Sequence, residues 1–263
     1  MEIHKEFMSI AIKNAKKGYG KVSPNPLVGC ILVKEGKIIG EGYHHKFGDP
    51  HAEVMAIRNA FENPAGSTAY ITLEPCCTVG KTPPCTEALI DNQIAEVYIA
   101  NIDPNPDHSG FGINVLEQAG INVYTDLLKE EAAKINKGYF HWIKTGRPYV
   151  IAKIAQTRDG FMGYDSNSSI WITSNQSKIH THELRSKIDA IMVGTQTAFI
   201  DNPSLTVESV SGHNPIRVIV DSDRKLPLHL KVFNDEKAPT IVLCSNANFE
   251  RSKTSFCQYI SVN

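Results

Sequence analysis

The sequence predicts a two-domain α/β protein. Strand-like and helix-like segments alternate along most of the chain, a pattern typical of a sheet with helices on both faces. Near residues 144–148 the pattern resets, because Gly146 and Pro148 end a helical stretch and a new apolar run follows. The length of 263 residues also exceeds what most single domains contain, roughly 100 to 200 residues. We therefore expect one domain over residues 1–146 and a second over residues 147–263.

The first domain should begin with a helix followed by a β-hairpin. Apolar residues recur at helical spacing from Phe7 to Lys17. Two short apolar runs, 28–33 and 38–42, flank a polar turn that contains Gly36, which is typical of a hairpin. Further along, we expect buried strands at 68–73, 97–100 and 121–124, and helices that start near His51, Cys85, Gly112 and Leu127.

The second domain should begin with a strand over residues 149–155. A helix is expected over 175–187, and further strands are expected at 190–193, 216–220 and 240–244. The connecting segments are rich in Asn, Ser and Pro, which favour loops.

Composition excludes several classes of protein. With 27 Lys and Arg against 28 Asp and Glu, the net charge is −1, which argues against a surface that binds nucleic acid or anionic lipid. No run approaches the ~20 apolar residues of a membrane helix, and the N-terminus lacks the apolar core of a secretory signal. We therefore expect a cytoplasmic protein, in which the six cysteines stay reduced and serve a metal or catalytic role.

Three short stretches hold the residues of a metal site: Asp49–Glu53, Glu74–Cys77 and Thr82–Cys85. The imidazole of His51 and the thiolates of Cys76 and Cys85 make three suitable ligands for Zn²⁺, which leaves a fourth tetrahedral position open to water. Prolines before His51 and Cys85 indicate two helix starts, the first with Asp49 as its expected cap. The positive end of a helix dipole favours a thiolate there.

Glu53 is expected to act as an acid and base rather than as a ligand. It stands two residues after His51, so on a helix the two side chains point in different directions. From the first turn its carboxylate can reach a water on the metal and transfer a proton to a leaving amine. His-x-Glu followed by Pro-Cys and a further Cys is the signature of zinc deaminases.

Each of these residues also has a plainer interpretation. A His-x-Glu tripeptide alone occurs by chance, and Cys76 and Cys85 could each be a small buried apolar residue. Their joint occurrence with the two proline contexts favours the metal site. Cys77 should point away from it, because neighbouring residues of an extended segment alternate in direction.

The spacing of the cysteines distinguishes between kinds of deaminase. Nucleoside and tRNA-type deaminases carry Pro-Cys-x-x-Cys, whereas Cys76 and Cys85 are separated by a segment that ends in Gly-Lys-Thr-Pro-Pro. Together with 23–29 (Ser-Pro-Asn-Pro-Leu-Val-Gly) and 103–106 (Asp-Pro-Asn-Pro), this resembles the bifunctional deaminase/reductases of riboflavin biosynthesis. Motifs of that family also follow in order in the second part, including Trp-Ile-Thr at 171–173 and Asp-x-Pro-x-Leu-Thr-Val at 201–207.

The resemblance implies two successive reactions. A cytidine-deaminase-like domain with three α/β/α layers would hydrolyse the amine of 2,5-diamino-6-(5-phosphoribosylamino)pyrimidin-4(3H)-one. A domain similar to dihydrofolate reductase would then use NADPH to reduce the ribosyl group to ribityl. No Gly-x-Gly-x-x-Gly follows a strand, so the cofactor would not be bound in the Rossmann manner. The family is often oligomeric, so the resemblance also admits a homo-oligomer.

The resemblance also assigns site residues. In the deaminase pocket it implies substrate contacts by Asn25, His44, Lys81, Asp103 and Asn105. In the reductase part it implies NADPH contacts by Ala155, Trp171, Thr197, Asp201 and Ser222, and substrate contacts by Ser169, Arg185 and Leu205. The residues alone leave alternatives open: Asn25 and Asn105 stand beside prolines and could simply form turns, and Arg185 could be a solvated helix residue.

Three departures from the family bear on these expectations. Thr78 stands where members usually have His, and Glu208 where many have Arg, an anion in place of a cation near a substrate phosphate. The sequence also stops at Asn263, before the glycine-rich segment and final strands of that family, so we expect an incomplete reductase domain. The alternatives are a deaminase with a vestigial second domain, a nucleoside or tRNA-type deaminase, and a zinc-stabilised binding module without catalysis.

Overall fold

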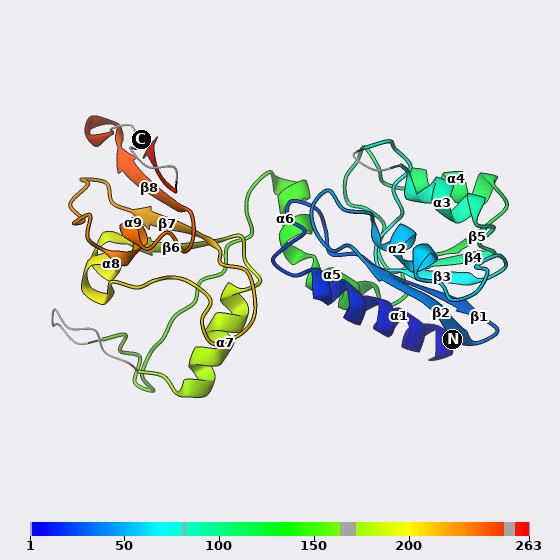
Figure 1. Ribbon diagram of the computed structural model, residues 1–263, viewed down its shortest axis with the longest axis horizontal. Coiled ribbons are helices and arrows are strands. Elements are labelled where there is room, and N and C mark those ends of the chain that lie inside the picture. Colours follow the sequence, from blue (N-terminus) through cyan, green and yellow to red (C-terminus); the bar gives the residue numbers. More distant parts are fainter. Residues whose placement is uncertain (1, 81–82, 164–171, 250–255, 263) are drawn as a thin grey trace. The chain divides into compact units, whose positions relative to one another are not determined.

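The computed structural model describes residues 2–80, 83–163, 172–249 and 256–262 (Figure 1). The chain divides into two compact units, Met1–Ile151 and Ala152–Asn263. Each unit contains one β-sheet, and each is described by itself.

The first unit contains a five-stranded mixed sheet with the strand order β2-β1-β3-β4-β5. Strand β1 pairs antiparallel with β2 and with β3, whereas β3, β4 and β5 run parallel. The bounds are β1 Gly29–Lys34, β2 Lys37–Tyr43, β3 Thr68–Ile71, β4 Glu96–Ile99 and β5 Asn122–Tyr124. The hairpin expected from the sequence is therefore present, and its two turn residues, Glu35 and Gly36, have φ values of 50° and 75°, as a tight hairpin turn requires.

Helices cover both faces of this sheet, which gives three layers (Figure 1). On one face lie α1 (Glu2–Ala15), which continues into the short 3₁₀ helix η1 (Lys16–Gly18), and α5 (Lys129–Ile135). On the other face lie α2 (Ala52–Arg58), α3 (Cys85–Asp91) and α4 (Phe111–Gln118). Alternate residues of β1 enter the two cores: Ile31 packs with α1, and Leu32 packs with α2.

Two glycines of β2 allow α2 to lie very close to the sheet. A Cβ atom added to Gly40 would lie 2.3 Å from the carbonyl oxygen of Ala56, and one added to Gly42 would lie 2.2 Å from that of Ala52. Ala52 and Ala56 are themselves fully buried. Because α2 begins directly after His51, this close approach fixes where that imidazole and Glu53 stand.

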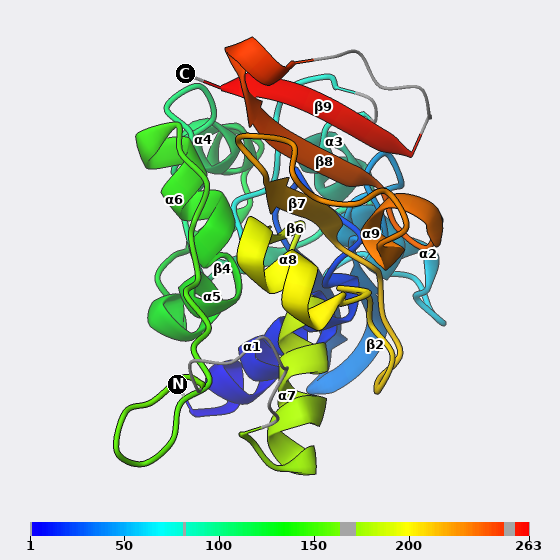
Figure 2. The same ribbon diagram turned by 90° about the vertical axis from the view of Figure 1, so that its left-hand side faces the viewer.

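The second unit contains a four-stranded parallel sheet with the order β6-β7-β8-β9 (Figure 2). Its strands are β6 Ala190–Gly194, β7 Ile216–Val220, β8 Thr240–Ser245 and β9 Cys257–Val262, and its helices are α7 Asn175–Arg185, α8 Thr195–Asp201, α9 Lys231–Asn234 and the 3₁₀ helix η2 Asn246–Asn248. Ile219 and Val242 are fully buried in its core. Arg217 is also fully buried, where it pairs with Asp235 at 2.7 Å and donates to Thr240 and Ala238.

The structure corrects three local expectations and adds elements that the sequence pattern did not predict. Residues 149–155 form no strand, and Val150 and Ile154 are largely exposed. Strand β5 is mostly exposed rather than buried. The N-cap of α2 is His51, not Asp49. The sequence pattern did not predict helices α6 (Lys137–Thr145), α8 and α9 or strand β9 as separate elements. Within the described ranges, no helix has the length and apolar character that a membrane span requires.

We expect Gly42→Ala to destabilise the first unit, because the added methyl would force α2 away from β2. The expected loss is about 1 to 3 kcal/mol, typical of overpacking. Gly138→Ala in α6 is the control, since nothing lies within 4 Å of its added Cβ and an alanine stabilises a helix by up to about 1 kcal/mol. Calorimetric melting of the full chain compares the two variants; equal melting temperatures would contradict this account of the packing.

Candidate metal centre and active-site pocket

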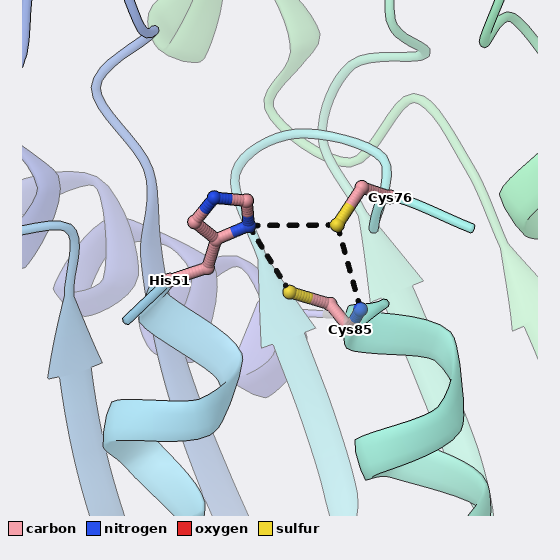
Figure 3. A group of neighbouring side chains, drawn as sticks. All are labelled: His51, Cys76 and Cys85. Atoms are coloured by element: carbon pink, nitrogen blue, oxygen red, sulfur yellow. Dashed lines mark hydrogen bonds between the residues drawn. The ribbon is translucent and has the colours of Figure 1, made fainter. Parts of the chain in front are cut away.

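One imidazole and two thiols converge beyond the carboxyl end of the central strand β3 (Figure 3). His51 is the N-cap of α2, Cys85 is the first residue of α3, and Cys76 lies in the loop after β3. The Nδ1 atom of His51 lies 3.5 Å from Sγ of Cys76 and 3.3 Å from Sγ of Cys85. All three ligand atoms lie within 4.8 Å of one another, and Cys77 is not part of the group.

These separations fit a tetrahedral zinc ion. With Zn–N near 2.0 Å, Zn–S near 2.3 Å and a tetrahedral angle, the nitrogen and sulfur of two ligands stand about 3.5 Å apart. A histidine with two cysteines is a donor set that zinc prefers, and a site with three protein ligands leaves one position for a substrate or water.

The surroundings of the cluster favour a thiolate. The backbone N–H of Cys85 donates to Sγ of Cys76 at 3.4 Å. The pKa of Cys76 is lowered, mainly by its hydrogen bond with Cys85 and further by its hydrogen bond with His51, although burial acts in the opposite direction. The hydrogen bond to Cys76, with burial, raises the pKa of Cys85 in turn. The hydrogen bond to Cys76 also raises the pKa of His51. The first negative charge of the cluster therefore belongs on Cys76, and a cation is needed before both sulfurs ionise.

Glu53 is buried beside the cluster, with only 3% of its surface exposed. Burial, with a further contribution from Cys76, raises the pKa of its carboxyl group to about 7. Its Oε2 atom has no hydrogen-bond partner within the part of the chain that the structure describes. A buried carboxyl with an unused oxygen and a pKa near neutrality can both accept and release a proton.

His51, Cys76 and Glu53 line a cavity of about 330 Å³, and Cys85 lies fully buried behind its wall, beside His51 and Cys76. Its wall also contains four residues named from the sequence as substrate contacts or as a departure from the family: Asn25, His44, Asp103 and Thr78. Asn105 lies on the same loop as Asp103, whose carboxylate accepts its backbone N–H at 2.9 Å. Lys81 lies outside the described residues.

His44 is held in one orientation. Its Nδ1 lies 3.3 Å from the carbonyl oxygen of Pro50, and its Nε2 lies 3.2 Å from the amide nitrogen of Asn25. Since a carbonyl oxygen only accepts, Nδ1 carries the proton and Nε2 accepts from Asn25. Burial lowers the pKa of His44, which agrees with this neutral tautomer.

The sequence did not assign three further residues with polar side chains to the pocket: Glu74, His108 and Tyr139. The hydroxyl of Tyr139 donates to the carboxylate of Asp103 at 3.2 Å, and burial, followed by Asp103, raises its pKa. The Nδ1 atom of His108 is buried without a partner among the described residues. No local motif points to Tyr139, which comes from α6, whereas Glu74 stands inside the quoted Glu-Pro-Cys-Cys stretch.

The residues expected to contact NADPH come from several segments of the second unit. Thr197 and Asp201 lie on α8 and Ser222 follows β7; all three are exposed, and no hydrogen bond between described residues joins them. Ala155 lies in a segment without regular structure. Ser169 and Trp171 lie outside the described residues.

The expected reductase substrate contacts differ in their surroundings. Leu205 is buried in the core of the second unit. Arg185 is partly buried and donates to the carbonyl oxygen of Thr206 at 2.6 Å, while its Nε has no partner among the described residues. Burial lowers the pKa of Arg185, and the nearby charge of Glu208 raises it. The negative charge of Glu208 therefore acts on Arg185, the residue expected to contact the substrate.

Family comparisons cover both units. Residues 1–101 match the cytidine and deoxycytidylate deaminase zinc-binding region, and residues 148–262 match the RibD C-terminal domain. These matches confirm the predicted fold class, a zinc-deaminase domain followed by a reductase-type α/β domain.

Several relatives are similar along nearly the whole chain. The riboflavin biosynthesis protein RibD of Aquifex aeolicus is 47% identical, over 96% of this chain and 71% of its own length. RibD of Actinobacillus pleuropneumoniae is 43% identical, over 91% of this chain and 64% of its own length. This chain thus spans about two thirds of the length of the relatives that it matches.

Solved structures give the same result. A diaminohydroxyphosphoribosylaminopyrimidine deaminase/5-amino-6-(5-phosphoribosylamino)uracil reductase from Thermotoga maritima superposes with a TM-score of 0.91 at 40% identity, over 98% of this chain and 74% of that one. RibD of Acinetobacter baumannii superposes with a TM-score of 0.90 at 37% identity, over 100% of this chain and 74% of its own. The chain therefore belongs to the RibD family, the bifunctional deaminase/reductases of riboflavin biosynthesis.

Proposed function

We propose that residues 1–146 catalyse the hydrolytic deamination of 2,5-diamino-6-(5-phosphoribosylamino)pyrimidin-4(3H)-one to 5-amino-6-(5-phosphoribosylamino)uracil. The observation that carries this proposal is the grouping of His51, Cys76 and Cys85 at a pocket whose wall also contains the buried carboxyl of Glu53. The Oε2 atom of that carboxyl has no hydrogen-bond partner among the described residues. A zinc-stabilised binding module would have no use for such a carboxyl.

His51, Cys76 and Cys85 would hold the zinc ion, which supplies Lewis acidity that makes a water molecule a stronger acid and a better nucleophile. Glu53 performs the proton transfers. Its Oε2 takes a proton from the attacking water as the new carbon–oxygen bond forms, and returns a proton to the amino nitrogen as the carbon–nitrogen bond breaks and ammonia leaves. Its pKa of about 7 suits a group that must alternate between both protonation states near neutral pH.

The walls of the pocket would orient the substrate. Asn25 and His44 line it as a hydrogen-bonded pair, in which the amide nitrogen of Asn25 uses one N–H on His44. Its second N–H and its side-chain carbonyl oxygen would bind the pyrimidine ring or a ribose hydroxyl. Asp103 and Asn105 approach from the loop after β4. The family resemblance assigns Lys81 to the substrate phosphate, for which its ammonium group is a suitable point charge.

For residues 147–263 we propose the second reaction of the family, the NADPH-dependent reduction of the ribosyl group. The match of residues 148–262 to the RibD C-terminal domain supports it. Ala155, Trp171, Thr197, Asp201 and Ser222 remain the proposed NADPH contacts, and Ser169, Arg185 and Leu205 the proposed substrate contacts. A cytoplasmic location and a homo-oligomeric state also stay predictions.

The first prediction concerns the metal ligands. Cys76→Ser and Cys85→Ser should each lose zinc, because a hydroxyl does not ionise to replace a thiolate near neutral pH. Cys77→Ser is the matched control, adjacent in sequence and outside the cluster, and should retain the wild-type zinc content. Elemental analysis of the purified chains measures this. Zinc loss from the Cys77 variant, or its retention in both of the others, would overturn the ligand assignment.

The second prediction concerns Glu53. Glu53→Gln keeps the shape of the side chain and removes its basicity, so the rate of ammonia release should fall by about 10²- to 10⁴-fold while zinc content is unchanged. Glu62→Gln serves as the control, because Glu62 is exposed and does not line the pocket. A Glu53→Gln chain that keeps its zinc and the wild-type rate would refute the role of Glu53 as acid and base.

The third prediction concerns the second unit. If Glu208 repels the substrate phosphate near Arg185, Glu208→Gln should lower the KM of the deaminated intermediate several-fold, by about 2- to 10-fold, with kcat little changed. The measurement is NADPH oxidation followed by absorbance. The absence of NADPH oxidation by the wild-type chain would instead identify a deaminase whose second domain is vestigial.

A further inference from the structure

The carboxylate of Glu74 collects four backbone N–H groups from one segment of the chain. Its Oε2 accepts from Asp103 at 3.2 Å and from Gly110 at 3.0 Å, and its Oε1 accepts from Gly112 at 2.9 Å and from Ile113 at 3.4 Å. Only 7% of Glu74 is exposed. A buried carboxylate with four donors is fully satisfied, and these charge-assisted bonds are stronger than those between neutral groups.

Two of these donors show that Glu74 caps a helix from a distance. The N-cap of α4 is Gly110, which has no side chain, and its φ of 80° is a conformation that glycine adopts readily. Gly112 and Ile113 are the second and third residues of α4, whose N–H groups an N-cap side chain would ordinarily bind. Glu74 takes over that task from another part of the chain.

The other two donors lie at the ends of the loop that carries expected substrate contacts. Asp103 begins the loop and Gly110 ends it, so a single oxygen atom fastens both ends. Between them, Asp103 accepts the N–H of Asn105, and the side-chain oxygen of Asn105 accepts the N–H of Asp107. Hydrogen bonds within the loop therefore fix its conformation, and the bonds to Glu74 fix its position.

Glu74 is also joined directly to the metal segment, because it precedes Cys76 by two residues. Its backbone N–H donates to the carbonyl oxygen of Asn101 at 2.9 Å. The two segments touch again at Gly112, where an added Cβ would lie 2.1 Å from the carbonyl oxygen of Pro75. No side chain separates the metal-ligand segment from α4 at this point, so a displacement of one is transmitted to the other.

We infer that Glu74 is a positioning residue, which sets the distance between the substrate-contact loop, residues 103–110, and the metal centre and thereby determines how tightly the substrate binds. This inference rests on the proposed deaminase function. Glu74 itself needs no contact with the substrate, because it acts through the loop. Its effect should therefore appear in KM and only weakly in the metal content or in kcat.

The test uses the full chain and Glu74→Gln. The amide retains one acceptor oxygen and turns an NH₂ group towards two of the four N–H donors, so part of the loop loses its anchor. We expect KM to rise about tenfold while kcat changes by less than about twofold, and zinc to be retained. Amide hydrogen exchange over residues 103–113 should become faster without substrate, a measurement independent of activity. The control is Glu117→Gln, which changes an exposed residue of α4. It should leave KM, kcat, zinc content and amide exchange unaltered.

A double-mutant cycle with Asn105→Ala separates positioning from general loosening of the fold. If Glu74 acts through the loop, adding Glu74→Gln to Asn105→Ala should raise KM by much less than the tenfold effect, about twofold or less. Independent, multiplicative effects on KM would overturn the inference, as would an unchanged KM or loss of zinc from Glu74→Gln.

Should Glu74→Gln not fold, Glu74→Asp, which keeps the charge and shortens the reach, takes its place in the same cycle. Failure of both variants to fold would assign Glu74 to folding alone and overturn the inference. Ammonia release by the wild-type chain is measured first: its absence defeats the proposed function, whereas an active wild type with an insensitive KM defeats only the role of Glu74.

Discussion

The deaminase unit depends on one constraint: two helices start next to each other beyond the carboxyl end of the central strand β3. His51 caps α2 and Cys85 opens α3, so both ligands are delivered by backbone that is fixed on the sheet. The N–H of Cys85 points at the sulfur of Cys76, which stabilises the first negative charge of the cluster. The close approach of α2 to Gly40 and Gly42 then limits how far His51 can move. A metal centre of this kind is a property of element packing as much as of its ligands.

The metal ligands could be predicted from the sequence because their signal is local. Prolines, helix starts and short spacings mark His51, Cys76 and Cys85 within three brief stretches. Tyr139 could not be found in this way: it reaches Asp103 from a helix distant in sequence, and only the packing of α6 brings the two together. The sequence also could not reveal how many donors Glu74 would meet, because all four belong to a segment that begins far beyond it along the chain.

The same distinction applies to the fold. The hairpin of β1 and β2 was predictable, since its turn residues and both strands are adjacent in sequence. The run at 149–155 is apolar like the strands of the hairpin, but it forms no strand. A strand forms only where a neighbouring strand offers hydrogen bonds to its backbone. Nor does composition indicate that Arg217 would be fully buried in a β-strand. Of its partners, Asp235 and Ala238 lie between α9 and β8, and Thr240 is the first residue of β8. They become neighbours of Arg217 only when β7 pairs with β8.

Two glutamates of the first unit show how the environment divides one chemical group into two roles. Glu53 and Glu74 are both buried and both line the same cavity. Glu53 lacks a partner for one oxygen, so burial favours its neutral form and keeps a proton within reach of exchange. Glu74 is bound by four N–H groups, so both of its carboxyl oxygens already have hydrogen-bond partners. A carboxyl group whose two oxygens are both occupied by N–H donors is well suited to holding a loop. A buried carboxyl with an unpartnered oxygen is costly for the fold, and it is useful where a proton must move.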